Sequence, residues 1–111
     1  MKKFLVLYRA PVSAKEQMAQ ATPEQMEAGM AHWNRWMEKH GESVAEPGSP
    51  LACGKHIAAG SVTDGDGTIT GYSIVQSESV ITATKLMHDH PHFHMPGGSI
   101  EVFEFRAMPA A

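Results

Sequence analysis

The sequence predicts a single α+β domain with the element order strand, helix, strand, strand, helix, strand. Three observations predict it: the apolar run FLVLY opens the chain, two segments carry helix-capping residues, and strand-like runs stand between and after those segments. At 111 residues the chain is long enough for one modest hydrophobic core. We therefore expect one domain over residues 1–111.

The run FLVLY predicts the first strand, over residues 3–9. Side chains alternate between faces along a strand, so this run presents apolar side chains on both faces. Such a pattern is typical of a central strand that is covered on both sides. The run stops at Tyr8 and Arg9 and is shorter than the roughly 7–15 apolar residues of a signal peptide, which favours the strand. Residues 11–21 are expected to form a connecting loop, with room for a helical turn around AKEQMAQ.

The clearest local signal predicts a helix over residues 23–40. Thr22 is placed to cap it, Pro23 takes the first helical position, and Gln25 completes a capping box. Gly41 is a typical residue just beyond a helix end. An apolar stripe with helical spacing is expected to pack into the core. Its members are Met26, Met30, Trp33 and Met37.

The stretch after this helix, AEPGSPLACG, is rich in proline and glycine and is expected to be a loop rather than a helix or central strand. Two strands are then predicted, over residues 56–62 and 68–76. They flank the turn sequence DGDG, which is a strong signal for a β-hairpin.

A second helix is predicted over residues 80–89, with Ser79 as its cap and Pro91 as its stop. Its inward face is expected to carry Val80, Ala83, Leu86 and Met87. Residues 97–106 are expected to form the last strand. Alternation along that strand would place Ile100 and Val102 on one side, with Phe103 and Phe105 contributing to the other.

This order is the split βαβ plan of ferredoxin-like folds, in which two helices cover one face of a four-stranded antiparallel sheet. A monomer has nothing left to cover the second face, although the first and last strands carry large apolar side chains there. An exposed apolar patch of that size is unusual for a soluble monomer. We therefore expect a homodimer that packs sheet against sheet.

Composition excludes several classes of partner. The formal net charge of −3 and the pI near 6.1 argue against a nucleic-acid-binding protein, which needs a basic surface. No segment approaches the roughly 20 apolar residues of a membrane span, so no membrane partner is expected. The single cysteine, Cys53, excludes an internal disulfide framework and suits the reducing cytoplasm.

The segment HDHPHFHMPGG, residues 88–98, holds four of the seven histidines. Alternate histidines in an extended segment point the same way, so His90 with His92, or His92 with His94, could chelate a metal ion. However, the run straddles a helix end and a proline, and no nearby acid completes a familiar ligand spacing. We predict no metal site and, in the absence of a nucleotide-binding motif, no cofactor.

Acid–base chemistry is the stronger hypothesis for these histidines, because imidazole exchanges protons near neutral pH. Asp89 is adjacent to His90, but neighbours at a helix end usually point apart. A pair assembled in space, His90 or His92 with His32 of the first helix, is better placed. The catalytic candidates are therefore His90, His92 and His32. The structural alternative is that Asp89 or His90 caps the last helical turn and interacts with the helix dipole.

Three further residues are candidates for ligand binding. Arg9, at the end of the first strand, could hold a carboxylate, or it could be a surface charge. Trp33 and Tyr72 could line the apolar wall of a cleft, or they could be core or interface residues. Beside the apolar stripe of the first helix, His32 and Trp36 could border that cleft.

Together these residues resemble the YciI-like (YCII-related) family. The matching segments are KKFLVLYR, ATPEQMEAGMAHWNRWM, the Pro50–Leu51 pair, TGYSIVQSES and HPHFHMPGGSIEVFEF, and the resemblance extends over nearly the whole chain. The resemblance implies a dimeric α+β barrel built from two sheets, with a pocket between helices and sheet. Some members resemble muconolactone isomerases, for which a His/Asp pair is suggested. Here Glu24 follows Pro23 where that histidine would stand, and His90 takes the place of the aspartate.

The expected function is cofactor-free acid/base isomerisation or elimination on a lactone or organic acid, in a cytoplasmic homodimer that binds a small molecule. The alternative is a non-catalytic binding or accessory module in which the histidines are structural.

Overall fold

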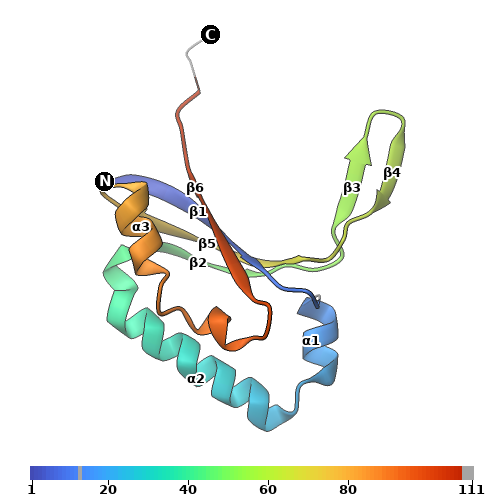
Figure 1. Cartoon of the computed structure of the whole chain (residues 1–111), viewed down its shortest axis with the longest axis horizontal. Coiled ribbons are helices and arrows are strands. Elements are labelled where there is room, and N and C mark those ends of the chain that lie inside the picture. The colour runs from blue at the N-terminus through green and yellow to red at the C-terminus, as the bar shows by residue number, and fades with distance from the viewer. Residues whose placement is uncertain (13, 109–111) are drawn as a thin grey trace.

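One four-stranded antiparallel sheet forms the centre of the computed structural model, which describes residues 1–12 and 14–108 (Figure 1). Its strand order is β2-β5-β1-β6, so the first strand in the chain is a central one, as predicted. The strands are β1 (Lys2–Arg9), β2 (Val44–Pro50), β5 (Ile69–Ser77) and β6 (Ser99–Glu104). This is the ferredoxin-like order, and it confirms the predicted fold class.

Two main helices, α2 (Pro23–His40) and α3 (Val80–Leu86), lie on one side of this sheet (Figure 1). The shorter elements are α1 (Ala14–Gln20), η1 (Gly41–Ser43), η2 (Pro91–His94) and the strands β3 (Lys55–Ala58) and β4 (Ser61–Asp64). Within the described part of the chain, none of the helices combines the length and the apolar composition of a membrane-spanning segment.

Both main helices begin at the capping boxes that their sequences contain. The Thr22 side chain accepts a hydrogen bond from the Gln25 amide, and the Gln25 side chain accepts one from the Thr22 amide. Ser79 and Thr82 form the same reciprocal pair at α3. These bonds satisfy amide groups that have no partner inside a first helical turn. The cap of α2 therefore fixes its start at the predicted residue.

The core lies between the sheet and the two helices. It contains Phe4, Val6, Tyr8, Trp36, Val75, Ala83 and Met87. The three β1 members alternate with Leu5 and Leu7, which point to the other face of the sheet and are half-buried. On that second face the structure leaves Phe103 half-exposed.

The predicted loop at residues 45–54 is wrong for its first half, because residues 44–50 form β2. Among the described residues this strand pairs with β5 alone, and it is an edge strand of the sheet. An edge position tolerates the missing amides of Pro47 and Pro50, since one side of the strand has no ladder to complete. Irregular register accompanies the Gly48 position, whose φ is +77°.

The predicted hairpin around DGDG is also wrong. Residues 55–64 form their own hairpin, β3 with β4, which turns at Ala59 and Gly60 and projects from the main sheet (Figure 1). The DGDG segment instead connects β4 to β5. The predicted strand over residues 68–76 is present as β5, but it pairs with β1 and β2 rather than with residues 56–62.

The helix boundaries and faces depart from expectation in smaller ways. The AKEQMAQ turn is a full helix, α1, while α3 ends at Leu86 rather than Asp89. Gly41 does not adopt the left-handed conformation of a helix stop but continues into η1. The apolar faces are only partly buried: Met26 is 46% exposed and Met30 63%, and Val80 of α3 is also exposed. Trp36, beside the predicted stripe, is the buried core residue of α2.

Candidate functional site

The histidine segment connects α3 to β6 through the short helix η2. Pro91 begins η2, and the His90 side chain caps it by accepting a hydrogen bond from the His92 amide at 3.0 Å. Gly97, at φ +75°, turns the chain toward β6. Gly98 packs so closely that a Cβ there would lie 2.8 Å from the His92 carbonyl oxygen. The capping predicted for His90 is therefore present, but it acts on η2 rather than on α3.

His90 is buried among aromatic rings and is only 1% exposed. Its ring centroid lies 4.9 Å from that of Tyr8, 4.7 Å from that of Trp33 and 4.6 Å from that of Trp36. The pKa of His90 is lowered to about 4, mainly by burial and to a smaller extent by the neighbouring His92. The ring is therefore neutral at pH 7.

The hydrogen bonds of His90 also define its tautomer. Because Nδ1 accepts the His92 amide hydrogen, the proton of the neutral ring is on Nε2. Among the described residues, Nε2 has no hydrogen-bond partner, although it is fully buried. The site thus contains a buried N–H donor directed at no protein acceptor, which is rare in folded proteins.

His92 lies beside His90 with the opposite arrangement of nitrogens. Its Nε2 is 2.8 Å from the carbonyl oxygen of Arg9, and since a carbonyl can only accept, Nε2 donates. Nδ1 is then the nitrogen of the neutral ring that can accept a proton. The His92 ring also packs 5.3 Å from the ring of Tyr8. Both histidines are therefore held in fixed orientations by the backbone around them.

Tyr8 closes the sheet side of this cluster. Its hydroxyl donates to Ser73 Oγ at 2.8 Å, and Ser73 donates in turn to the Pro47 carbonyl oxygen at 2.7 Å. Burial raises the pKa of Tyr8 to about 12. Tyr8 therefore stays protonated at neutral pH. Tyr8 was not identified from the sequence as a site residue, because its place in a core strand indicated only a structural role.

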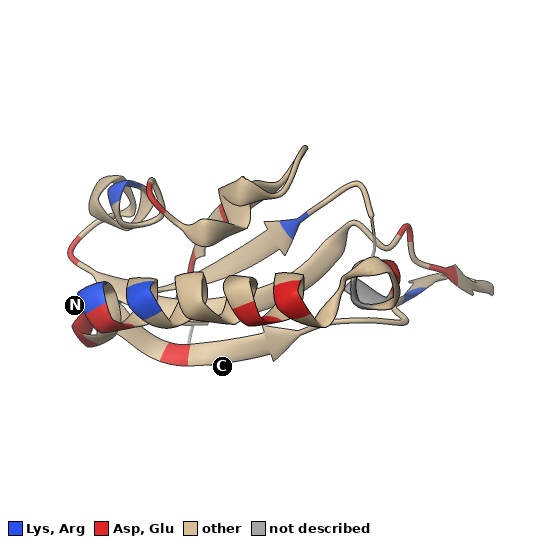
Figure 2. Ribbon diagram, turned by 90° about the horizontal axis from the view of Figure 1, so that it is seen from below, with Lys and Arg blue, Asp and Glu red and all other residues tan. Residues whose placement is uncertain are grey.

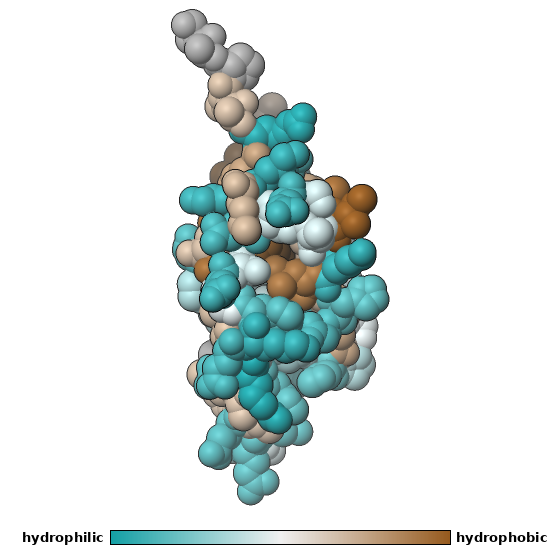
Figure 3. Space-filling model, turned by 90° about the vertical axis from the view of Figure 1, so that its left-hand side faces the viewer, coloured by the Kyte–Doolittle hydropathy of each residue, from teal (hydrophilic) through white to brown (hydrophobic). Residues whose placement is uncertain are grey.

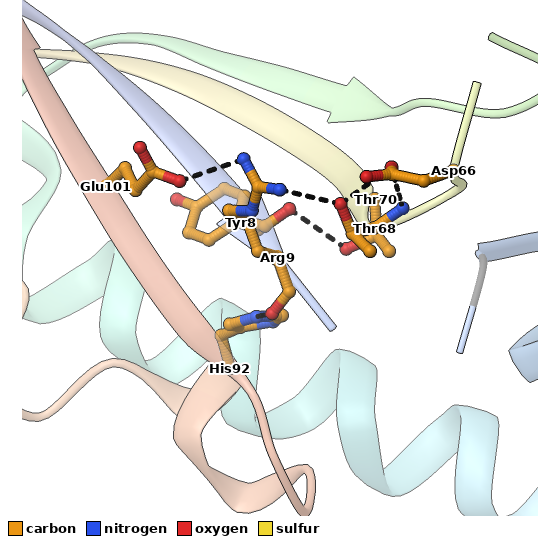
Figure 4. Close-up of polar contacts among 7 residues, drawn as sticks. All are labelled: Tyr8, Arg9, Asp66, Thr68, Thr70, His92 and Glu101. Carbon is orange, nitrogen blue, oxygen red and sulfur yellow. Dashed lines mark hydrogen bonds and ion pairs between the residues drawn. The ribbon is translucent and has the colours of Figure 1, made fainter. Parts of the chain in front are cut away.

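The Arg9 side chain extends away from His92 and joins a polar network at the strand ends (Figure 4). Its guanidinium lies 2.9 Å from Glu101 Oε1 and donates to Thr68 Oγ1 at 2.7 Å. The Thr68 hydroxyl donates to Asp66 at 2.8 Å. The side chain predicted to hold a ligand carboxylate is thus already paired with a protein carboxylate, while its backbone carbonyl orients His92.

Asp89 points away from His90, as expected for neighbours at a helix end. Its Oδ2 accepts from Lys39 Nζ at 2.9 Å, and its Oδ1 accepts from the Trp36 indole N–H at 3.2 Å. The hydrogen bond from Lys39 lowers the pKa of Asp89 to about 2, with a smaller contribution from His40. Asp89 therefore links η2 to α2 and forms no dyad with His90.

A groove of about 230 Å³ lies between α2 and η2. It is lined by His32, Arg35, Trp36, Lys39, Asp89, Pro91 and His94. The exposed ring of His32 contacts that of His94, with centroids 4.8 Å apart, and its Nδ1 is 3.3 Å from Arg35 Nη2. Trp36 belongs both to this groove and to the ring cluster around His90, so it separates the two.

The predicted site residues are thus only partly brought together. His90, His92 and Trp33 join in one cluster with Tyr8. His32 contacts His94 and does not form the predicted pair with His90 or His92. Tyr72 is on the sheet face opposite the helices, where its hydroxyl donates to Glu46 at 2.8 Å. Arg35 and Lys39 are groove residues that sequence reasoning missed; their spacing with His32 along one helix face was the available signal.

A second groove, of about 300 Å³, lies on the other side of η2. Its lining is largely apolar and consists of Thr84, Met87, His88, Phe93, Ile100 and Val102. Hydrophobic side chains also gather among hydrophilic ones at the end of the molecule where α3 lies (Figure 3).

No family model matches this chain, and no curated protein matches it in sequence. Among solved structures it is similar to the 5-chloro-2-hydroxyhydroquinone dehydrochlorinase of Burkholderia phenoliruptrix AC1100, in a complex with 2,5-dihydroxybenzoquinone. The TM-score is 0.54 at 15% sequence identity, over 94% of this chain and 93% of that one. The similarity shows a shared fold.

Proposed function

We propose that this protein binds a small organic acid or lactone beside the histidine segment and catalyses proton transfer on it without a cofactor. Isomerisation and elimination are the reaction types that such chemistry serves. The observation that carries the proposal is the buried N–H of His90, which has no acceptor among the described residues. Leaving a buried donor unsatisfied costs about 1–3 kcal/mol, and a ligand oxygen would recover it.

His90 fits the role of a neutral hydrogen-bond donor better than that of a general acid. Because its pKa is about 4, His90 is a neutral imidazole at pH 7 and cannot act as an imidazolium acid. A neutral imidazole can still polarise a carbonyl by donating from Nε2, in an environment where burial strengthens the interaction. His92 would then accept the proton of the ligand at Nδ1. His32, which lines the groove, would be a second group that can exchange a proton with the ligand.

The ligand would enter through the α2–η2 groove. Trp36 and Pro91 line that groove, and Trp36 packs 4.6 Å from the ring of His90. Rotation of the Trp36 indole away from Asp89 would open a route to Nε2. Trp33, half-buried and 4.7 Å from His90, then forms the apolar wall of the site.

The structural neighbour supports a ligand of this kind. That neighbour is a dehydrochlorinase in a complex with 2,5-dihydroxybenzoquinone, a small ring with oxygen substituents. Such oxygens match the donor that His90 offers.

We also propose that two copies pack sheet against sheet in the cytoplasm. The sheet face opposite the helices supports the dimer, because Leu5, Leu7 and the half-exposed Phe103 share it. The single exposed thiol, Cys53, supports a reducing compartment.

A second candidate function is a binding module without catalysis. It is favoured by the backbone hydrogen bonds of both histidines: His90 Nδ1 caps η2, and His92 Nε2 holds the Arg9 carbonyl. In this alternative, the histidines only shape the connection into β6.

Binding of 2,5-dihydroxybenzoquinone, followed by calorimetry, tests the site. We expect His90→Phe to keep the fold and weaken binding, since it preserves the ring packing but removes the donor. The control is His56→Phe, at an exposed position on β3 away from both grooves, which should bind as the wild type does. Equal binding by all three proteins would contradict the role of His90.

Solvent-deuterium incorporation into α-angelica lactone, followed by NMR, tests catalysis. The wild type should accelerate exchange, and His92→Ala should lose that acceleration. Binding of the quinone without any accelerated exchange would favour the non-catalytic module.

A further inference from the structure

We propose that the α2–η2 groove recognises the carboxylate of a small planar organic acid, and that Arg35 is the residue that binds it. The proposal rests on the function proposed above and narrows its ligand from acids and lactones to the anionic class. It assigns the anion to a residue outside the histidine segment.

The groove is built so that one helix face supplies most of its polar lining. His32, Arg35 and Lys39 are separated by three and four residues, so they stand above one another along α2. Its volume of about 230 Å³ lies below the roughly 300–1,000 Å³ of typical ligand pockets, which suits a small acid.

The charges in the groove leave one cation in excess. Arg35 and Lys39 are positive, and Asp89 is negative. Lys39 is paired with Asp89 at 2.9 Å. Across residues 1–12 and 14–108, Arg35 forms no ion pair; its Nη2 contacts His32 and its Nε donates to the Ala31 carbonyl.

The helix dipole does not account for this cation. Lys39 lies in the last turn of α2, where a positive charge is favoured by the carbonyl groups of the helix end. Arg35 lies a turn earlier. The basic residues of α2, drawn in blue, lie in the half of the helix nearer His40, which also contains Glu38 (Figure 2). A guanidinium presents two parallel N–H groups that match the two oxygens of a carboxylate, which a lysine does not.

The second groove provides a built-in comparison. The described residues that line it include no Lys, Arg, Asp or Glu. An apolar or neutral ligand would prefer that groove, whereas an anion would prefer the one beside Arg35.

Backbone-amide NMR titrations with benzoate and with its neutral analogue benzamide test the proposal. We expect benzoate to shift the amides of residues 32–39 and His94, and benzamide to bind at least tenfold more weakly. Arg35→Gln should lower benzoate affinity about tenfold, which corresponds to about 1.4 kcal/mol. The matched control, Arg106→Gln, removes an exposed arginine beyond β6 and should leave binding unchanged.

Asp89→Asn provides the opposite expectation. It removes the only acid of the groove lining and keeps an oxygen to accept from Trp36. Benzoate should therefore bind more tightly to this variant, a result that loss of folding would not produce. Added salt should weaken benzoate binding in every variant that retains Arg35.

The proposal is overturned if benzoate and benzamide bind equally, if Arg35→Gln binds as the wild type does, or if only the second groove responds. Its failure is separable from that of the proposed function. Binding of benzoate that His90→Phe abolishes and Arg35→Gln leaves intact would retain His90 and reject Arg35. The reverse pattern would retain the anion site and reject the role of His90.

Discussion

Acidification below about pH 6.5 is expected to destabilise this fold through one residue, the buried His90. The pKa of His90 is about 4 in the folded chain, against an ordinary value of 6.5. Between these values the unfolded chain binds a proton that the folded chain does not. Stability from this residue is therefore fully present above pH 6.5 and is lost as the pH falls toward 4.

The magnitude follows from the two pKa values. A tenfold change in an ionisation constant is about 1.4 kcal/mol, so the whole difference amounts to about 3 kcal/mol. Lowering the pH from about 8 to about 5 would reduce the unfolding free energy by about 2 kcal/mol of this total. For a domain of this size that loss corresponds to a fall of about 10 °C in Tm.

Guanidinium denaturation at a series of pH values measures this directly. His90→Phe keeps an aromatic ring in the cluster and cannot titrate, so its unfolding free energy should vary less with pH than that of the wild type. The same substitution at His88, an exposed residue, controls for loss of a histidine in general. Asp89 does not interfere, because its pKa is about 2 and its contribution is lost only below its ordinary value of 3.8.

Parallel curves for the wild type and His90→Phe over this range would refute the reasoning. They would mean that the His90 ring is protonated at no extra cost in the folded chain, and hence that it is not the neutral buried donor on which the proposed site depends.

Further substitutions at glycine, tyrosine and phenylalanine positions have clear expected outcomes. Gly48→Ala should lower the unfolding free energy by at least about 2 kcal/mol, because its Cβ would lie 1.8 Å from the Tyr72 carbonyl oxygen at φ +77°. Gly60→Ala, at φ +80° with no atom within 4 Å, should cost only about 1 kcal/mol, and equal losses would contradict this. Tyr8→Phe removes a buried hydrogen bond and should lower the unfolding free energy by about 1 kcal/mol in urea denaturation. Tyr72→Phe removes an exposed hydroxyl and should have little effect. A larger loss for Tyr72→Phe than for Tyr8→Phe would be inconsistent with the burial of Tyr8. Phe103→Asp should convert the proposed dimer to a monomer in sedimentation, and a wild type that is itself monomeric at micromolar concentration would reject the dimer.

The positions of β1 and β5 and the starts of the main helices were accessible from the sequence because their signals are local. Alternation in FLVLY identifies a strand, and the Thr22–Gln25 box identifies a helix start, from residues within a few positions of one another. The edge strand β2 was not accessible. Its proline and glycine content contradicts a strand, and only pairing with β5 overrides that local preference.

By itself, the sequence determined where the histidines lie along the chain, that a proline interrupts them, and that two capped helices pack on an antiparallel sheet. Only the tertiary structure decided which histidine is buried, which nitrogen carries its proton and which helix residues face it. His90 is separated from Tyr8 and Trp36 by more than fifty positions in the sequence, yet these two rings pack against it and shield it from water. Desolvation and hydrogen bonding depend on such distant neighbours, so the chemistry of His90 is a property of the packed fold rather than of its motif.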